Sequence, residues 1–288
     1  MTKPTDKVNL SENRAVLQRS TGTVRLGFKR RGNETVLDDL FQEGSGKIRM
    51  ALSEKGRLKE AVIINTTGGL TDGDVFSTAI HWQKDTTASV TTQAAERIYR
   101  SRGGDAHLKT KLRMEQGATA LWLPQETIMF DHARLRRSNG ISLVGDARLI
   151  AVEACIFGRT AMGEKVTTGM MRDEWHIRHD GRLIFADRFC LEGDIEAELN
   201  HPAIAGGAIA MATIVHVSPN NLIEALRDVI DSRTCAGGVT RLGPLTLTRL
   251  FAKNAQELRE VIVLLLDVLI SGTLPKHTGS LLPRVWSL

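Results

Sequence analysis

In "HLKTKLRM" (residues 107–114) two kinds of side chain alternate with a period of two. Its alternating sets are Leu108, Thr110, Leu112 and Met114 on one side, and His107, Lys109, Lys111 and Arg113 on the other. Successive side chains of a strand point to opposite faces, so this pattern predicts a half-buried β-strand. The same alternation recurs at residues 23–28, and strand-like segments follow one another over most of the chain. The pattern therefore predicts a mainly β protein.

The remaining elements predict how the strands are joined and where helices occur. "EWHIRHDGRLIFADR" (174–188) reads as a hairpin, with Asp180 and Gly181 supplying the positive φ angles of a tight turn. Because strand follows strand with little helix between, we expect mainly antiparallel sheets. Two C-terminal helices are predicted. The first is capped by Ser218, and the second is capped by Asn254 and ends at Gly272.

Composition limits the organisation of the chain and its location. The 288 residues contain no evident linker, which favours one domain over 21–288 behind a flexible N-terminal tail, 1–20. The longest apolar run, 261–270, is half the length of a membrane span. The polar N-terminus lacks the features of a secretory signal, so a cytoplasmic protein without membrane contact is expected.

Charge and cysteine content exclude further classes. The net charge is +5, but the only dense basic cluster is "RLRR" (134–137) and aromatic residues make up 5% of the chain. Nucleic acid binding normally needs a basic stripe or a stacking surface, so no nucleic acid partner is expected. Three widely separated cysteines form neither a disulfide framework nor a zinc-ribbon pattern.

The loop "NTTGGLTDGD" (65–74) holds three glycines and two aspartates directly after an apolar run. A phosphate loop needs the N-terminus of a following helix and usually a lysine, whereas this loop precedes another strand and carries carboxylates. Phosphate binding is therefore disfavoured. Two interpretations remain open: Asp74 interacts with a cation, or it stabilises a glycine-rich turn.

A second glycine loop, "GRTAMGEK" (158–165), has the glycine spacing of a nucleotide-binding loop, but Glu164 stands where that motif requires lysine. A carboxylate there repels phosphate and attracts a cation. If Glu164 is buried it needs a partner or a metal, and if it is exposed it carries no functional meaning.

The segment "TTQAAERIYRS" (91–101) gathers Glu96, Arg97, Tyr99 and Arg100, and contains the only tyrosine of the chain. One interpretation is an ordinary surface ion pair between Glu96 and Arg100. The other is a partner contact through Arg97, Tyr99 and Arg100, because tyrosine and arginine are frequent hot-spot residues.

Motifs of hydrolytic enzymes are missing from the sequence. It contains neither a Gly-x-Ser-x-Gly elbow nor a His-Glu-x-x-His zinc motif, and a strand would send His176 and His179 to opposite faces. These absences disfavour nucleophilic and zinc hydrolysis, but they do not exclude an enzyme whose catalytic groups converge only in the fold. An all-β hydrolase that uses Asp74 and Glu164 as a carboxylate pair remains an alternative.

Five stretches together resemble the UreD family of urease accessory proteins, also called UreH, in order from about Thr21 to Trp286. They are "NTTGGLTDGD", "TTQAAERIYRS", "LWLPQETIMFDHARLRRSNGISL", "GRTAMGE" and "LPRVW". Five linked motifs are far more specific than any one of them. Two positions differ from the pattern: Arg97 replaces a lysine, and Asp72 stands where glycine is frequent.

The resemblance implies a two-layered, β-helix-like body with C-terminal helices. It also implies a non-enzymatic chaperone that binds apo-urease, UreF and, through UreF, UreG, and that helps to deliver nickel to urease. No permanently bound cofactor is expected, only transient Ni²⁺. Ni²⁺ accepts nitrogen and oxygen ligands, so Asp74, Glu96 and Glu164 are the candidate residues of a transient nickel path. A β adaptor without any metal role is the remaining alternative.

Overall fold

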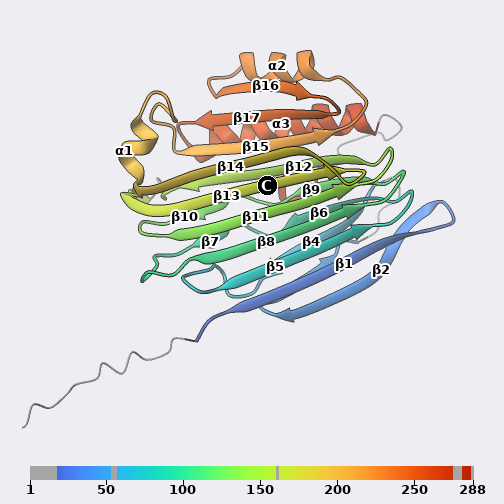
Figure 1. Cartoon of the computed structure of the whole chain (residues 1–288), viewed down its shortest axis with the longest axis horizontal. Coiled ribbons are helices and arrows are strands. Elements are labelled where there is room, and N and C mark those ends of the chain that lie inside the picture. The colour runs from blue at the N-terminus through green and yellow to red at the C-terminus, as the bar shows by residue number, and fades with distance from the viewer. Residues whose placement is uncertain (1–17, 53–56, 160–161, 275–280, 287–288) are drawn as a thin grey trace, which may run out of the picture.

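Two facing β-sheets form the body of the protein in the computed structural model (Figure 1). The structure describes residues 18–52, 57–159, 162–274 and 281–286. Sheet A has seven strands in the order β14-β13-β11-β8-β5-β1-β2. Their bounds are β1 (Thr21–Arg31), β2 (Glu34–Gly44), β5 (Val75–Trp82), β8 (Ala106–Met114), β11 (Arg134–Leu143), β13 (Thr168–His179) and β14 (Arg182–Asp194).

Sheet B lies behind sheet A and has ten strands, eight of them in the order β16-β17-β15-β12-β9-β6-β4-β3. The other two, β7 and β10, pair with each other, and β10 also pairs with β12. The bounds are β3 (Gly46–Met50), β4 (Lys59–Asn65), β6 (Thr87–Thr92), β7 (Glu96–Ile98), β9 (Thr119–Leu123), β10 (Thr127–Met129), β12 (Arg148–Phe157), β15 (Ala210–Val217), β16 (Ala236–Leu242) and β17 (Leu245–Ala252).

The chain passes back and forth between the two sheets along the middle of the sequence. From β4 to β13 the main strands alternate between sheet B and sheet A. Neighbours within a sheet are therefore successive turns of one coil and run parallel, as in the pairs β5–β8, β8–β11, β6–β9 and β9–β12. This arrangement confirms the two-layered, β-helix-like body.

The expectation of mainly antiparallel sheets is wrong for this middle part. Antiparallel pairs occur towards the two ends of the coil, for example β1–β2 and β13–β14. The predicted hairpin is one of them, with Asp180 at φ 48° and Gly181 at φ 78°. Short connections usually return a strand to its own sheet, whereas here they carry the chain to the opposite sheet.

The strand β12 is buried on both of its faces, which explains its almost continuous apolar sequence. Leu149 and Ala151 belong to the core between the two sheets. Ile150 and Val152 belong to a second core beneath the helices. Sheet B is thus the central layer of the molecule.

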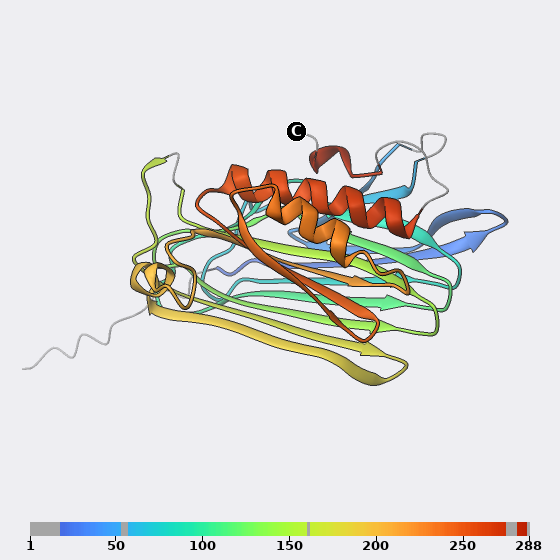
Figure 2. The same cartoon turned by 90° about the horizontal axis from the view of Figure 1, so that it is seen from above.

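Helices cover the outer face of sheet B (Figure 2). They are α2 (Ile223–Asp231) and α3 (Ala255–Thr273), while α1 (Ile195–Asn200) follows β14 and a short 3-10 helix (Arg284–Trp286) lies near the C-terminal end. The Asn254 cap is confirmed, because its side chain accepts a hydrogen bond from the Glu257 backbone N–H at 2.8 Å. The Ser218 cap is wrong: α2 begins at Ile223, and the Ser218 hydroxyl accepts from the Asn220 N–H in a preceding turn.

Residues 1–17 of the predicted tail lie outside the described residues, while the Ser20 N–H donates to the Asp74 carboxylate at 2.7 Å. Among the described helices, none combines the length and apolar character required to span a membrane.

Candidate functional site

The loop 65–74 and the "ERIYRS" segment form one local structure. The Leu70 N–H donates to the Arg97 carbonyl oxygen at 2.7 Å, and the Tyr99 N–H donates to the Leu70 carbonyl oxygen at 2.8 Å. Gly69 precedes Leu70 in this pairing, and a Cβ atom added to it would collide with the Tyr99 ring. The glycine-rich composition of the loop therefore permits a close approach of two segments.

Asp74 stabilises the turn at the end of this loop. The residue is 6% exposed, and its carboxylate accepts hydrogen bonds from the backbone N–H groups of Ser20, at 2.7 Å, and Thr71, at 2.9 Å. Two backbone donors satisfy a buried carboxylate without a metal ion. The structural interpretation of this aspartate thus has a defined geometry, and its predicted role towards nickel stays a prediction.

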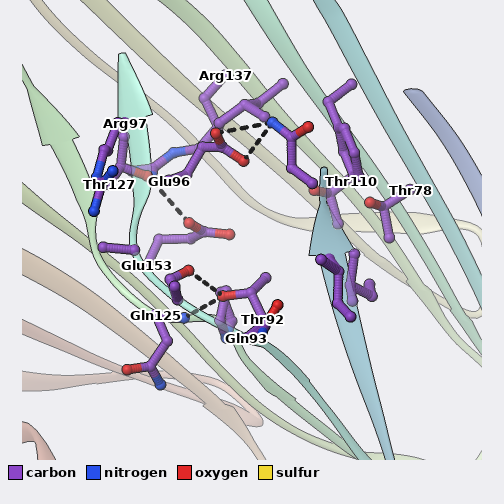
Figure 3. A pocket seen from close by; sticks show the side chains of 18 of the residues that line it. Thr78, Thr92, Gln93, Glu96, Arg97, Thr110, Gln125, Thr127, Arg137 and Glu153 are labelled. Carbon is purple, nitrogen blue, oxygen red and sulfur yellow. Dashed lines mark hydrogen bonds and ion pairs between the residues drawn. The ribbon is translucent and has the colours of Figure 1, made fainter. Parts of the chain in front are cut away.

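Glu96 lines a cavity of about 320 Å³ between the two sheets (Figure 3). The cavity is walled by residues of β5, β8 and β11 in sheet A and of β4, β6, β9 and β12 in sheet B. The Asn65 amide donates to both carboxylate oxygens of Glu96, at 3.1 and 3.3 Å. Burial raises the pKa of Glu96 to about 7, against the lowering effect of the Asn65 hydrogen bond. This carboxyl group therefore titrates near neutral pH.

A buried ionic cluster, which we call the Arg137 triad, consists of Arg137, Glu153 and Asp173. Arg137 and Glu153 also line the cavity (Figure 3). The Arg137 guanidinium donates to Glu153 at 2.7 Å and forms a two-point contact with Asp173 at 2.7 and 2.9 Å. The Trp122 indole N–H donates to the other oxygen of Glu153 at 3.0 Å. Since β11 and β13 lie in sheet A and β12 in sheet B, the triad links the two sheets.

Burial and charge act in opposite directions within the triad. Burial alone would lower the pKa of Arg137, but the charges of Asp173 and Glu153 outweigh it and raise that pKa. Burial raises the pKa of Glu153, with Arg137 opposing the shift. Nearby Cys155 has a pKa raised to about 12, first by burial, so its thiol is protonated at neutral pH.

Sequence reasoning did not identify the triad, although signals for it were present. Arg137 belongs to the basic cluster "RLRR". Along the strand it lies on the buried face together with Leu135, whereas Arg136 lies on the opposite face. Glu153 is the only charged residue inside the apolar segment 149–157. A charge within a fully buried strand requires a partner, and this rule would have singled out Glu153.

Glu164 lies apart from the cavity that Glu96 lines. Its carboxylate accepts a hydrogen bond from the Arg159 Nε–H at 2.5 Å, and it borders a smaller pocket of about 200 Å³. The three predicted nickel-path residues are therefore not brought together. Glu164 borders this smaller pocket and Asp74 does not, so the proposed hydrolytic carboxylate pair gains no support. In the part of the chain that the structure describes, no group of three or more His, Cys, Asp or Glu residues is placed to hold a metal ion.

The predicted partner residues lie on one local surface. Arg97 and Arg100 are exposed, whereas Tyr99 is half-buried and packs edge-on against Phe130, with ring centroids 4.9 Å apart. The Tyr99 hydroxyl donates to the Gly68 carbonyl oxygen at 3.2 Å. The predicted ion pair between Glu96 and Arg100 is wrong. β7 ends at Ile98, and Arg100 instead lies 3.6 Å from an Asp131 oxygen.

Comparisons with known proteins agree with the motifs. Residues 20–287 match the model of the UreD urease accessory protein family. The chain is 40% identical over 278 residues to urease accessory protein UreD 1 of Brucella abortus biovar 1 (strain 9-941), covering 94% of this chain and 95% of that one. It is 40% identical over 275 residues to urease accessory protein UreD of Mesorhizobium japonicum, with coverage of 94% and 95%. It is also 40% identical over 276 residues to urease accessory protein UreD of Xanthobacter autotrophicus, with coverage of 95% and 92%. This chain therefore belongs to the UreD family of urease accessory proteins.

Proposed function

We propose that the protein is a non-enzymatic scaffold of urease maturation, which binds apo-urease and the UreF–UreG accessory complex and passes Ni²⁺ towards the urease active site. Family membership supports the role in urease maturation. The nickel step rests on one structural observation, the cavity between the two sheets that carries the carboxylates of Glu96 and Glu153.

The cavity offers the chemistry that a transported Ni²⁺ ion needs. Ni²⁺ accepts oxygen and nitrogen ligands, and negative charge lowers the cost of moving a dication through a low-dielectric interior. Glu153 supplies that charge within the Arg137 triad, and Glu96, whose pKa lies at about 7, supplies it when its carboxyl group is ionised. Neutral oxygen atoms supply further contacts that can be exchanged one by one, and they belong to Asn65, Thr78, Thr92, Thr110, Gln125 and Thr127.

Arg137 adds a positive charge to the same wall, but two carboxylates neutralise it. Its guanidinium contacts both Glu153 and Asp173 at 2.7 Å, which leaves the triad with a formal net charge of −1 when all three groups are ionised. A cation near Glu153 therefore meets a net negative cluster rather than a net positive one. Transfer of the ion stays transient in this proposal, with no permanent metal site.

The proposal is tested by removing charge from the cavity while keeping its shape. In Glu96→Gln and Glu153→Gln, we expect the nickel bound to urease after activation with UreF and UreG to fall at least threefold. The matched control is Glu43→Gln, because Glu43 is exposed on β2 and borders neither the cavity nor the Arg137 triad. Nickel is measured by atomic absorption on purified urease, and assembly of the complex by gel filtration.

Two results distinguish the alternatives. Full nickel loading by both cavity variants, in complexes that assemble normally, would favour an adaptor without a metal role. The variants Asp74→Asn and Glu164→Gln address the remaining predicted nickel residues. Both residues lie outside the cavity, so we expect smaller losses of urease-bound nickel from these variants. A loss as large as that of Glu96→Gln would mean that the nickel path extends beyond the cavity.

A further inference from the structure

The outer face of sheet A carries a groove of about 590 Å³ that takes no part in the proposed nickel path. The groove crosses β1, β5, β8, β11 and β13. Helices α2 and α3 pack on sheet B, on the opposite side of the molecule (Figure 2). No described helix lies over this face of sheet A in Figure 1. The groove is therefore an open surface in the described part of the chain.

Small residues at neighbouring strand positions form the floor of this groove. These small residues are Ala79, Gly140 and Ser142. In the strand register Ala79 and Gly140 lie on the two sides of Lys111, and one row further along Ser142 lies beside Arg113. These positions alternate with buried Ile80, Leu112 and Ile141, so their side chains face outward. Long side chains flank short ones, and the surface is hollowed between them.

The walls of the groove on β8 and β13 are basic. Lys111, Arg113 and Arg178 are exposed, and His176 is exposed beside them. Among the described residues, neither Lys111 nor Arg113 has an acidic partner within ion-pair distance, and Arg178 donates only to the Gly181 carbonyl oxygen at 3.4 Å. Exposed cations without acidic partners attract anions most effectively.

The opposite end of the groove, on β2, is acidic. Asp38 and Asp39 border it, and Asp38 already pairs with Lys29 at 2.8 Å. The two aspartates thus lie at the β2 end, where Arg25 of β1 packs over the Phe41 ring, and three exposed cations cluster over β8 and β13.

We infer that this groove binds an acidic segment of a partner polypeptide, whose carboxylates lie over Lys111, Arg113 and Arg178. Lys111 and Arg113 are two residues apart on one strand, a separation of about 7 Å. Arg178 lies two strands away from β8 in the sheet order, a distance of about 10 Å. Charges spread over such distances match several carboxylates along a chain better than one compact anion.

Two other anions fit the groove less well. A single phosphate favours a helix N-terminus or a nest of backbone N–H groups, whereas the backbone N–H groups here are engaged in the sheet. Single-stranded nucleic acid favours large aromatic side chains for base stacking, and no Phe, Tyr or Trp is among the residues that border the groove, all of which are described.

The probe for this inference is a fluorescein-labelled dodecaglutamate peptide, whose binding to the purified full chain is followed by anisotropy at low salt. The variant Lys111→Glu/Arg113→Glu/Arg178→Glu should weaken binding at least tenfold. The control Arg31→Glu/Lys84→Glu/Arg182→Glu changes the net charge equally at exposed positions outside the groove, and should weaken binding less than threefold.

A variant without a charge change tests the position of the ligand. In Gly140→Leu the new Cβ would meet only the Thr110 carbonyl oxygen, at 3.8 Å, so the fold should accept a side chain that fills the floor. We expect at least a threefold loss of affinity with unchanged circular dichroism. Equal losses in the control charge variant, unchanged binding by Gly140→Leu, or absence of binding by the parent chain would each overturn the inference. Displacement of the peptide by 1 mM inorganic phosphate or by an equimolar oligonucleotide would do so as well.

Discussion

Gly68 and Gly69 are adjacent in the loop 65–74, yet they are required for different reasons. Gly68 has φ 72° and open space around it, so Gly68→Ala should cost only the strain of a left-handed residue, about 1 kcal/mol. At Gly69 an added Cβ would also collide with the Tyr99 ring and lie 2.7 Å from the Arg97 carbonyl oxygen. Gly69→Ala should therefore cost about 3 kcal/mol.

The comparison is made by urea unfolding of the two alanine variants beside the parent protein. Equal destabilisation of both would show that the loop can move away from Tyr99. The close pairing of the loop with the "ERIYRS" segment would then have little energetic weight.

Glu96 makes the stability of the protein depend on pH around neutrality. Its pKa is raised from 4.5 to about 7, first by burial, so between these values the folded state binds more protons than the unfolded state. The stabilisation of the folded state by this proton is fully present below pH 4.5 and is lost as the pH rises through 7. Glu96→Gln removes the titration, so the variant should gain about 2 kcal/mol relative to the parent between pH 5 and pH 8.

The measurement is a pair of urea titrations at pH 5 and pH 8, with Glu43→Gln as the control because its side chain is exposed on β2. A stability difference between Glu96→Gln and the parent that stays constant with pH would contradict the burial of this carboxyl group.

Among the elements, the Arg137 triad connects strands of both sheets in the interior. Arg137→Met removes the cation and leaves Glu153 and Asp173, which are 6% and 5% exposed, without a cationic partner. Breaking a buried ion pair in this way should cost about 3–5 kcal/mol. The variant Arg137→Met/Glu153→Gln/Asp173→Asn removes all three charges and should recover at least half of that loss.

Unfolding in urea distinguishes the two variants, and near-ultraviolet circular dichroism of Trp122 and Trp175 reports on the surrounding packing. A cost below about 1 kcal/mol for Arg137→Met would mean that water or the cavity compensates the two carboxylates. The triad would then not hold the sheets together.

Helix α3 is attached to β15 through a buried histidine. His216 is 1% exposed and its Nε2 atom lies 3.0 Å from the Thr273 hydroxyl oxygen. Burial, assisted by Arg241 and Arg148, lowers its pKa to about 4, so below pH 6.5 the unfolded state binds the extra proton. The stability present above pH 6.5 is lost as the pH falls towards 4, by about 2 kcal/mol at pH 5.

His216→Gln should abolish this loss, whatever its effect at pH 8. The exposed His201 provides the control variant His201→Gln, which should keep the acid sensitivity of the parent. Thermal unfolding at pH 5 and pH 8 measures both, and an unchanged acid sensitivity of His216→Gln would point to another group.

Elements were predictable where their signals are local. The period of two in residues 107–114 is confirmed as β8, and the Asn254 cap as the start of α3. The predicted start of α2 was wrong because Ser218, like other short polar residues, stabilises turns as readily as it caps helices. The triad was missed because three residues distant in sequence meet only after the sheets have stacked.

At the scale of the whole molecule, alternation along the strands fixed their inward faces but not their partners. Strand pairing depends on whether each connection returns to its own sheet or crosses to the other, and short connections do both. The parallel coil therefore came from the family resemblance and not from periodicity. The same limit applies to the site: Glu96 lines the cavity, while Asp74 lies in a turn and Glu164 beside Arg159.

The coil also places the predicted partner surface next to the cavity. Arg97 borders the cavity and is exposed, and Arg100 follows it at the end of the same segment with its side chain 68% exposed. Tyr99 between them is held by Phe130 and by the Gly68 carbonyl oxygen. A partner that contacts the two arginines would thus lie beside the cavity that contains Glu96.

Assembly with UreF and apo-urease should depend on the exposed arginines of this surface. Arg97→Ala/Arg100→Ala removes two exposed side chains, so the fold should keep its melting temperature while recovery of UreF and apo-urease in a pull-down falls at least fivefold. The control Arg31→Ala/Arg182→Ala makes the same change at exposed positions of sheet A and should retain full recovery.

Tyr99→Phe keeps the packing against Phe130 and loses one hydrogen bond, which separates a contact made by the tyrosine hydroxyl from its structural role. The double arginine variant is compared with the parent chain at the lowest protein concentration at which the parent still recovers both partners. Full recovery of both partners by the variant under this condition would place their binding sites elsewhere on the molecule.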